Sequence, residues 1–319
     1  MPALGLGNGH AMTIAAWARR RRYAALPPAQ TRFVPVDTES QVRLDCFWQP
    51  YRADAPTLLG LHGLEGSSEA HYMRGIADKA WTRGWNVVLL NQRNCGGTEH
   101  LTPGLYNSGL TEDPRAVLRL LHAEVPFTRL AFVGYSLGGN LALKLAGEAT
   151  EMPDLPVTAV AAVSPTIDLS LCVDAIELRQ NVLYQWNFVR GLKARMRRKA
   201  RVWPGRFNLA PLERIRTIRQ FDDAYTAPHH GFGTAANYYA RASALRVIDR
   251  IDVPTLIIAA EDDPFVPATQ FLRPEVRHNP HVHVSLQRHG GHCGFIERQT
   301  PTHDGYWAEA QAVGFLGVT

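Results

Sequence analysis

Five stretches of the chain are almost entirely apolar, and each of them ends in a turn-forming sequence. They are TLLGLHG (57–63), WNVVLLN (85–91), LAFVG (130–134), VTAVAAVSP (157–165) and TLIIAAEDD (255–263). Continuous apolar runs of this kind are typical of strands that are covered on both faces. A sixth stretch, VRLDCFW (42–48), alternates apolar and polar residues, which predicts an antiparallel strand at the edge of the sheet.

Segments with the helical spacing of apolar residues lie between these runs, at 69–84, 111–125 and 138–150. Strands that alternate with helices indicate an α/β fold, in which helices flank a mostly parallel central sheet. A chain of 319 residues is long enough for one large α/β domain with an insertion.

The alternation breaks between residues 169 and 250. This stretch is rich in aromatic and basic residues and has helical character, but it contains no apolar run of the strand type. An insertion here, after the sixth strand of the expected sheet, lies over the carboxyl edge, where open α/β sheets bind their ligands. We therefore predict a core formed by residues 1–168 and 251–319, with a helical cap at 169–250.

The formal net charge of +5 conceals two basic segments. Residues 190–219 hold eleven Lys or Arg against one acidic residue, Glu213, and residues 19–22 are four arginines, so the rest of the chain is net negative. The segment 190–219 is either a solvated helical face or a surface that attracts an anionic membrane or a phosphate-bearing substrate. No nucleic-acid recognition motif accompanies the charge, so we expect no nucleic-acid partner.

The cysteines and the first residues of the chain help to predict the cellular compartment of the protein. The four cysteines are dispersed and form no CxxC pair, which argues against a zinc site or a disulfide scaffold and fits a reducing compartment. Near the start, a short apolar stretch precedes the arginines, the reverse of a secretory signal. No run approaches the roughly 18 apolar residues of a membrane span. These features predict a cytoplasmic protein.

The sequence GYSLG (134–138) places Ser136 between Gly134 and Gly138, after an apolar strand and before a helical segment. A Gly-x-Ser-x-Gly turn in this setting is typical of a nucleophile elbow, because side chains at the glycine positions would collide with neighbouring backbone. The alternative is a purely structural turn. The positive end of the following helix would favour a nucleophile here.

A serine nucleophile needs a base and an orienting carboxylate, which in this architecture follow later strands in the order acid, then histidine. Asp263 lies at the end of the strand in LIIAAEDDPFVP and is the favoured acid. Its neighbours Asp262 and Glu261, and Asp168 after the preceding strand, are the alternatives.

The base is expected in SLQRHGGHCGF (285–295), where glycines flank His292 and let a loop carry the imidazole over the sheet edge. His289 is the competitor. Because His278, His281 and His283 are also near, a metal site is conceivable, but no carboxylate or cysteine at ligand spacing completes it and we predict none.

An oxyanion hole is expected in GLHGLEGSS (60–68), the loop after the first buried strand. Its donors would be the backbone N–H groups of Leu64 and of Leu137, the residue after the nucleophile. His62 is expected to be a structural histidine that bonds the loop backbone.

Several longer motifs carry a family resemblance. They are GNGHAMT, HGLEGSSEAHYMRG, NQRNCGG, YNSGLTED, GYSLGGN, FDDAYTAPHHGFGTAANYY, PTLIIAAEDDPFVP and GGHCGF. The chain resembles the α/β-hydrolase superfamily and, within it, the YheT-like esterases. The resemblance implies a serine esterase with the triad Ser136, Asp263 and His292, acting on short- to medium-chain acyl esters. One departure is Asn94, where relatives commonly have glycine.

Three functions are compatible with these residues. The leading one is hydrolysis of a small-molecule acyl ester through an acyl-enzyme, which needs no cofactor. The same triad could instead transfer the acyl group to an alcohol or act on a thioester, and a lipid-binding protein without catalysis is the third. Aromatic residues of the cap would either wall an acyl pocket or pack the cap core: Tyr184, Trp186, Phe188 and Trp203.

Overall fold

The central sheet has eight strands in the order β1-β2-β4-β3-β5-β6-β7-β8. The computed structural model describes residues 2–301 and 303–318. The strands are β1 (Gln30–Pro35), β2 (Gln41–Phe47), β3 (Thr57–Leu61), β4 (Asn86–Asn91), β5 (Leu130–Tyr135), β6 (Val157–Val163), β7 (Thr255–Ala260) and β8 (Val282–Gln287). Strands β3 to β8 run parallel to one another, whereas β2 is antiparallel to both β1 and β4.

The expectation that residues 42–48 form the edge strand is wrong in its position. These residues form β2, which is antiparallel as expected but lies between β1 and β4. The edge strand at this end of the sheet is β1, whose sequence QTRFVP keeps mostly exposed side chains. Its local pattern therefore carries little of the apolar signal that marks the other strands.

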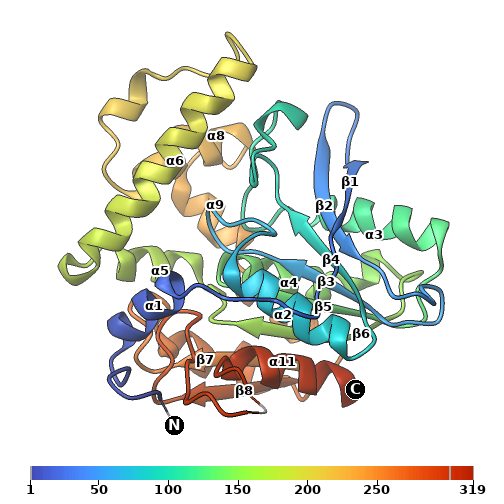
Figure 1. Cartoon of the computed structure of the whole chain (residues 1–319). Helices are drawn as coiled ribbons and strands as arrows, with labels where there is room; N and C mark the ends of the chain where they lie inside the picture. The colour runs from blue at the N-terminus through green and yellow to red at the C-terminus, as the bar shows by residue number, and fades with distance from the viewer. Residues whose placement is uncertain (1, 302, 319) are drawn as a thin grey trace.

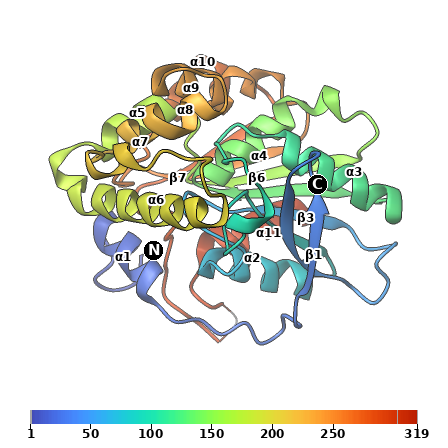
Figure 2. The same ribbon diagram turned by 90° about the horizontal axis from the view of Figure 1, so that it is seen from above.

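Helices cover both faces of the sheet (Figures 1 and 2). The helices α2 (His71–Thr82) and α11 (Trp307–Val318) cover one face, and α3 (Glu112–Glu124) and α4 (Leu137–Gly147) cover the other. Because successive side chains of a strand point to opposite faces, Leu58 packs in the cluster under α2 and α11, while Leu59 packs in the cluster under α4.

The segment between β6 and β7 folds into helices. They are α5 (Leu169–Ile176), α6 (Val182–Val202), α7 (Ile218–Phe221), α8 (Ala227–His229) and α9 (Ala235–Ala242), and α10 (Pro274–Arg277) follows β7. Figure 1 shows the long α6 crossing above the edge of the sheet, and Figure 2 shows these helices along one side of the molecule. The insertion thus covers the edge where ligands of α/β folds bind.

Asn140 joins this cap to α4, the helix that follows the turn at Ser136. Its side-chain amide donates to the backbone oxygens of Ser108 (3.0 Å) and Ala242 (2.9 Å), and its Oδ1 accepts from the N–H of Ala244 (2.7 Å). Asn140 is fully buried, so these bonds replace the water that it loses on folding.

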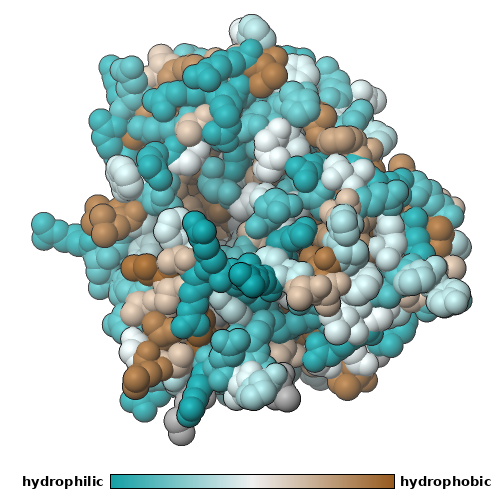
Figure 3. Space-filling view, viewed as in Figure 1, coloured by the Kyte–Doolittle hydropathy of each residue, from teal (hydrophilic) through white to brown (hydrophobic). Residues whose placement is uncertain are grey.

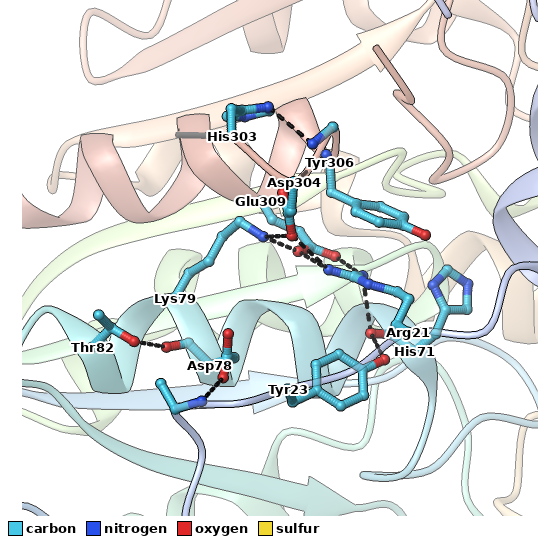
Figure 4. Close-up of polar contacts among 12 residues, drawn as sticks. Arg21, Tyr23, His71, Asp78, Lys79, Thr82, His303, Asp304, Tyr306 and Glu309 are labelled. Carbon is cyan, nitrogen blue, oxygen red and sulfur yellow. Dashed lines mark hydrogen bonds and ion pairs between the residues drawn. The ribbon is translucent and has the colours of Figure 1, made fainter. Parts of the chain in front are cut away.

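The N-terminal segment begins with α1 (Gly9–Ala18) and then crosses α2 and α11. Figure 4 shows the contacts that fix it: Arg21 Nη2 lies 2.8 Å from Glu309 Oε2, and the Tyr23 hydroxyl donates to the backbone oxygen of His71 (2.9 Å). Lys79 Nζ binds the same Glu309 carboxylate at 2.8 Å. No helix in the part of the chain that the structure describes is long and apolar enough to span a bilayer.

Candidate active site

The turn between β5 and α4 holds Ser136 in a sparsely populated backbone conformation, with φ 55° and ψ −120°. A Cβ added to Gly134 would lie 2.1 Å from the carbonyl oxygen of Gly138, and one added to Gly138 would lie 2.3 Å from the carbonyl oxygen of Leu61. Both positions therefore require glycine. A strained residue held by such packing is common at active sites, and here it stands at the carboxyl end of a central strand.

Ser136 opens into a cavity of about 110 Å³ beneath the cap. Most of its wall is apolar, with contributions from the core and from the cap helices. Examples are Leu64, Leu137, Leu169, Val173, Phe188, Leu192, Phe221 and Phe265. Such a cavity, with a few polar groups on an apolar wall, is typical of a small-molecule site.

Asp263 and His292 form a buried pair at the same edge of the sheet. His292 Nδ1 lies 2.9 Å from Asp263 Oδ2, and the Asp263 side chain is only 1% exposed. The other carboxylate oxygen accepts from the N–H groups of Phe265 (3.1 Å) and Val266 (3.0 Å). These bonds fix the carboxylate, so the imidazole has one preferred orientation and carries its proton on Nδ1.

His292 and Ser136 share neighbouring residues. The ring of Phe265 lies 4.1 Å from the imidazole, centroid to centroid, and also lines the cavity that contains Ser136. The N–H of Ser136 donates to the carbonyl oxygen of Val163 (2.9 Å), and the thiol of Cys293 contacts the same oxygen at 3.8 Å. The histidine loop and the serine turn thus meet at the end of β6.

The neighbouring pair that competes in the sequence has a different role. Asp262 Oδ1 accepts from the N–H groups of Gly290 and Gly291, both at 2.9 Å, and its Oδ2 lies 3.2 Å from His289 Nδ1. His289 is about one-third exposed. Asp262 therefore fixes the loop that carries His292, while Asp263 pairs with His292 itself. The sequence EDD does not indicate which aspartate has which role.

Of the remaining acidic alternatives, one caps a helix and the other is exposed. Asp168 precedes α5 and caps it, with its side chain accepting from the N–H of Leu171 (3.2 Å). Glu261 is exposed.

The loop after β3 lies against the serine. A Cβ added to Gly63 would be 3.2 Å from Ser136 Cβ, and Leu64 and Leu137 both line the cavity. Within residues 2–301 and 303–318, the backbone N–H groups of Leu64 and Leu137 have no hydrogen-bond partner. The N–H of Leu137 lies in the first turn of α4, where helices leave their donors unsatisfied.

His62 is buried and bonds the loop backbone on both sides. Its Nδ1 lies 2.8 Å from the carbonyl oxygen of Gly63, and its Nε2 accepts from the N–H of Gln92 (3.1 Å). Burial lowers the pKa of His62 to about 4, so the ring is neutral.

The pKa of His292 is shifted the other way. Burial works to lower it, but the negative charges that Cys293 and Asp263 can carry, together with the hydrogen bond to Asp263, raise the pKa of His292 above its ordinary value. The imidazolium is therefore well stabilised next to Asp263.

Two contacts of the site have no clear signal in the sequence. Thr13 of α1 accepts from the N–H of His292 (2.8 Å), which ties the start of the chain to the histidine loop. Arg195 and Lys199, from the basic stretch of α6, line the cavity instead of facing solvent. Among the described residues, no group of three His, Cys, Asp or Glu side chains is arranged to hold a metal ion.

A glycine-flanked serine on a strand-to-helix turn, at the edge of an eight-stranded, mostly parallel sheet, defines an α/β enzyme of the hydrolase type. Comparison with known proteins agrees, because residues 56–299 match the family described as alpha/beta hydrolase fold. The chain belongs to this family.

The chain is also similar in sequence to several individual proteins. The chain is 38% identical to the protein named "Putative esterase YheT" of Escherichia coli over 99% of this chain and 92% of that protein. It is 30% identical to mouse phospholipase ABHD3 over 85% of this chain and 68% of the relative. It is 29% identical to the yeast medium-chain fatty acid ethyl ester synthase/esterase 2 over 77% and 59%.

The Pyrococcus furiosus esterase Pf2001 shares the fold, with a TM-score of 0.58 at 18% identity, over 91% of this chain and 93% of that one.

Proposed function

We propose that the protein is a serine carboxylic-ester hydrolase with Ser136 as nucleophile, His292 as base and Asp263 as the orienting acid. The observation that supports this most is the buried 2.9 Å pair of His292 and Asp263 beside a strained, glycine-flanked serine. The family membership and the esterase names of relatives point the same way.

The proposed reaction proceeds through an acyl-enzyme. His292 takes the proton of the Ser136 hydroxyl while the serine oxygen attacks the acyl carbonyl carbon, and the oxyanion accepts from the N–H groups of Leu64 and Leu137. The C–O bond to the alcohol then breaks, and the imidazolium returns the proton to the leaving alkoxide. Water, deprotonated by His292, attacks the acyl-enzyme and releases the acid and free Ser136.

The cavity supports the proposed substrate class. Its largely apolar wall suits the acyl chain of a short- to medium-chain ester. Of the four cap aromatics that the sequence indicates, Phe188 lines the cavity. Trp186 is 59% exposed, and Trp203 donates its indole N–H to the backbone oxygen of Glu99 at 2.8 Å.

The test is turnover of a chain-length series of nitrophenyl esters by the wild type and by Ser136→Ala. We expect hydrolysis with a chain-length optimum, a loss on the order of 10⁴-fold or more in kcat for the variant, and fluorophosphonate labelling of the wild type alone. A folded wild type that neither labels nor turns over any ester would refute the proposal and favour a non-catalytic lipid-binding protein.

Acyl transfer to an alcohol is the second candidate, because one relative is named an ethyl ester synthase as well as an esterase. Both reactions use the same acyl-enzyme and differ in whether water or an alcohol attacks it. The ratio of ethyl ester to free acid, measured with increasing ethanol, separates them, and a ratio that stays near zero rejects transfer.

We also propose that the protein contacts anionic membrane surfaces peripherally, from the cytoplasm. Many of the positive charges in the basic segment 190–219 are paired or buried, so fewer of them can attract a membrane than the composition indicates. Four of its arginines form ion pairs with carboxylates, namely Arg195, Arg198, Arg206 and Arg219, and Lys199 is buried.

A more suitable surface lies where α1 meets the start of α6. His10 of α1 lies 3.3 Å from the Tyr184 hydroxyl of α6. Each of these two helices carries an exposed tryptophan, Trp17 on α1 and Trp186 on α6. Figure 3 shows apolar side chains interspersed with polar ones along this side. Arg19, Arg20 and Arg22 follow α1 directly and are exposed, whereas Arg21 is buried against Glu309. Aromatic residues next to cations suit an anionic lipid surface.

Co-sedimentation with vesicles tests this contact. We expect binding to vesicles that contain phosphatidylserine, weaker binding at high salt, and a loss of binding in the double variant Trp17→Ser/Trp186→Ser. Equal binding to neutral vesicles, or binding that salt does not change, would refute the proposal.

A further inference from the structure

Two cationic side chains of α6 lie inside the molecule, on the wall of the cavity that contains Ser136. Arg195 and Lys199 are one helical turn apart and therefore share a face of the helix. Arg195 is 7% exposed and Lys199 is fully buried. Buried cations are rare unless they are paired, so their partners are informative.

Lys199 has neutral partners. Its ammonium donates to Asn94 Oδ1 at 2.5 Å and to the carbonyl oxygen of Thr102. The nearby carboxylate of Glu99 is engaged by Arg198, 2.7 Å away. Burial lowers the pKa of Lys199 to about 7, since no carboxylate pairs with it directly.

Asn94 explains part of this arrangement. It has a left-handed backbone conformation, with φ 67°, and its amide donates to the carbonyl oxygen of Gly104 (3.0 Å). This bond directs its Oδ1 to Lys199. Asn94 thus holds the lysine on the cavity wall.

Arg195 is only partly satisfied. Its Nη2 lies 2.6 Å from Glu65 Oε1, and its guanidinium carbon lies 4.9 Å from the centre of the Tyr106 ring. Its Nε and Nη1 are buried and have no hydrogen-bond partner among the described residues. Unmade hydrogen bonds of a buried charged group are costly, so a ligand that accepts them would be held strongly.

We propose that Arg195 and Lys199 bind an anionic oxygen group, a carboxylate or a phosphate, that the substrate carries in addition to its ester. Glu65 pairs with Arg195, and Glu99 pairs with Arg198, so no carboxylate among the described residues bonds Lys199 directly. An anion would balance the charge of Lys199 and accept from the unpartnered N–H groups of Arg195. The one acidic residue among those that line the cavity, Asp222, already accepts from the Tyr239 hydroxyl at 2.7 Å. The ligand is then an amphiphile, with an apolar chain on the apolar wall and its anion on α6.

This inference rests on the proposed esterase function for its kinetics, but not for binding. The binding test uses the Ser136→Ala protein and measures its Tm with octyl phosphate, octanoate or octanol. We expect both anions to raise the Tm, octanol to have a smaller effect, and Lys199→Met in the same background to remove the difference. Arg197→Gln, an exposed arginine on the same helix, is the matched control and should retain it. Equal shifts with all three compounds would overturn the proposal.

The kinetic test compares each anionic ester with a neutral ester of the same chain length. It also shows whether the anion lies on the acyl chain or on the alcohol of the substrate. One arm pairs the mono-nitrophenyl esters of adipate, suberate and sebacate with nitrophenyl hexanoate, octanoate and decanoate. The other arm pairs hexanoyl glycerol phosphate with hexanoyl glycerol. We expect a preference of about tenfold or more for the anionic member in one arm, mainly in KM, and its loss in Lys199→Met and in Glu65→Gln/Arg195→Gln. The double change avoids leaving Glu65 buried and unpaired.

The outcomes separate the two proposals. Turnover of neutral esters without preference for an anion in either arm would overturn the anion site and leave the esterase intact. A Tm shift by the anions without turnover of any ester would support the anion site and refute the esterase.

Discussion

The guanidinium of Arg195, on the cap helix α6, lies 2.6 Å from the carboxylate of Glu65, and Glu65 directly follows Leu64 in the loop after β3. The cap is therefore joined to the loop that we expect to supply an oxyanion donor. Glu65 also has a left-handed backbone, with φ 61°, and its N–H donates to the Tyr106 hydroxyl at 3.3 Å. Three separate segments thus fix the backbone at Leu64.

Glu65→Gln should therefore impair the chemical step. Without its charge the side chain holds Arg195 less tightly, and a shifted Leu64 N–H would weaken oxyanion binding by up to the 10²–10³-fold in kcat typical of a lost donor. The measurement is kcat and KM for a neutral nitrophenyl ester. A variant that changes KM but keeps kcat would show that Glu65 acts on binding only.

The rate should depend on the protonation of His292. Because the pKa of His292 lies above its ordinary value of 6.5, the imidazole is protonated below that pKa and cannot act as base. We expect kcat/KM to rise with pH above 6.5. Asp263→Asn removes a negative charge, so the rise should move to lower pH while the maximal rate falls by about 10⁴-fold.

Cys293→Ala gives a second check on the same titration. Removal of the thiol should also lower the pKa of His292, but it should leave the orienting carboxylate and most of the rate. A pH profile that none of these changes moves would exclude His292 as the titrating base.

Gly138→Ala should disrupt the serine turn. The added Cβ would lie 2.3 Å from the carbonyl oxygen of Leu61, so the loop after β3 or the turn itself must shift. We expect a clear drop in Tm and loss of activity. Gly314→Ala in α11 is the control, because its Cβ meets nothing within 4 Å and alanine favours the helix by roughly 0.5–1 kcal/mol.

Asn140→Ala should loosen the cap. The change removes the bonds to Ser108, Ala242 and Ala244 and leaves buried backbone groups unpaired, at about 1–3 kcal/mol for each such group. A fall in the free energy of unfolding of at least 2 kcal/mol in urea is expected. Gln311→Ala, an exposed polar truncation on α11, should change it by less than about 0.5 kcal/mol.

Stability should fall as the pH drops from 6.5 to 4. Burial lowers the pKa of His62, His71 and His230 to about 4, so each takes up a proton on unfolding in this range. Asp222 opposes this, because burial raises its pKa to about 6 and the folded state then holds the proton. Burial also raises the pKa of Glu65 and Asp113, which act like Asp222, and lowers that of His229, which acts like the other histidines. We expect the histidines to outweigh these carboxylates, so unfolding becomes easier as pH falls.

Urea unfolding at several pH values measures this slope. His62→Gln should flatten it, since glutamine can bond the same backbone groups without titrating. A free energy of unfolding that stays constant between pH 6.5 and 4 would contradict the assignment of neutral, buried histidines.

The sheet and the serine turn were predictable because their signals are local. A strand buried on both faces is mostly apolar, as β4 is between its terminal asparagines, and a turn as tight as that at Ser136 admits glycine alone at two positions. Strand β1 was not predicted from the sequence, because a strand with mostly exposed side chains has no distinctive pattern.

The basic stretch of α6 could not be interpreted from its composition. Whether Arg195 and Lys199 face solvent depends on Glu65, Asn94 and Thr102, which lie about a hundred residues away in the chain. Likewise, the bond from His292 to Thr13 joins residues at opposite ends of the sequence. Contacts between residues so far apart in the sequence can be identified only in the folded structure.

That last contact bears on how the protein is made. Thr13, Ser136 and His292 are translated in this order, so the proposed base is the last of the three to be made. Since domains generally fold as units, a growing polypeptide that has not reached residue 292 lacks both this contact and the base proposed for Ser136. The proposed site can thus assemble only after the ribosome has passed that position.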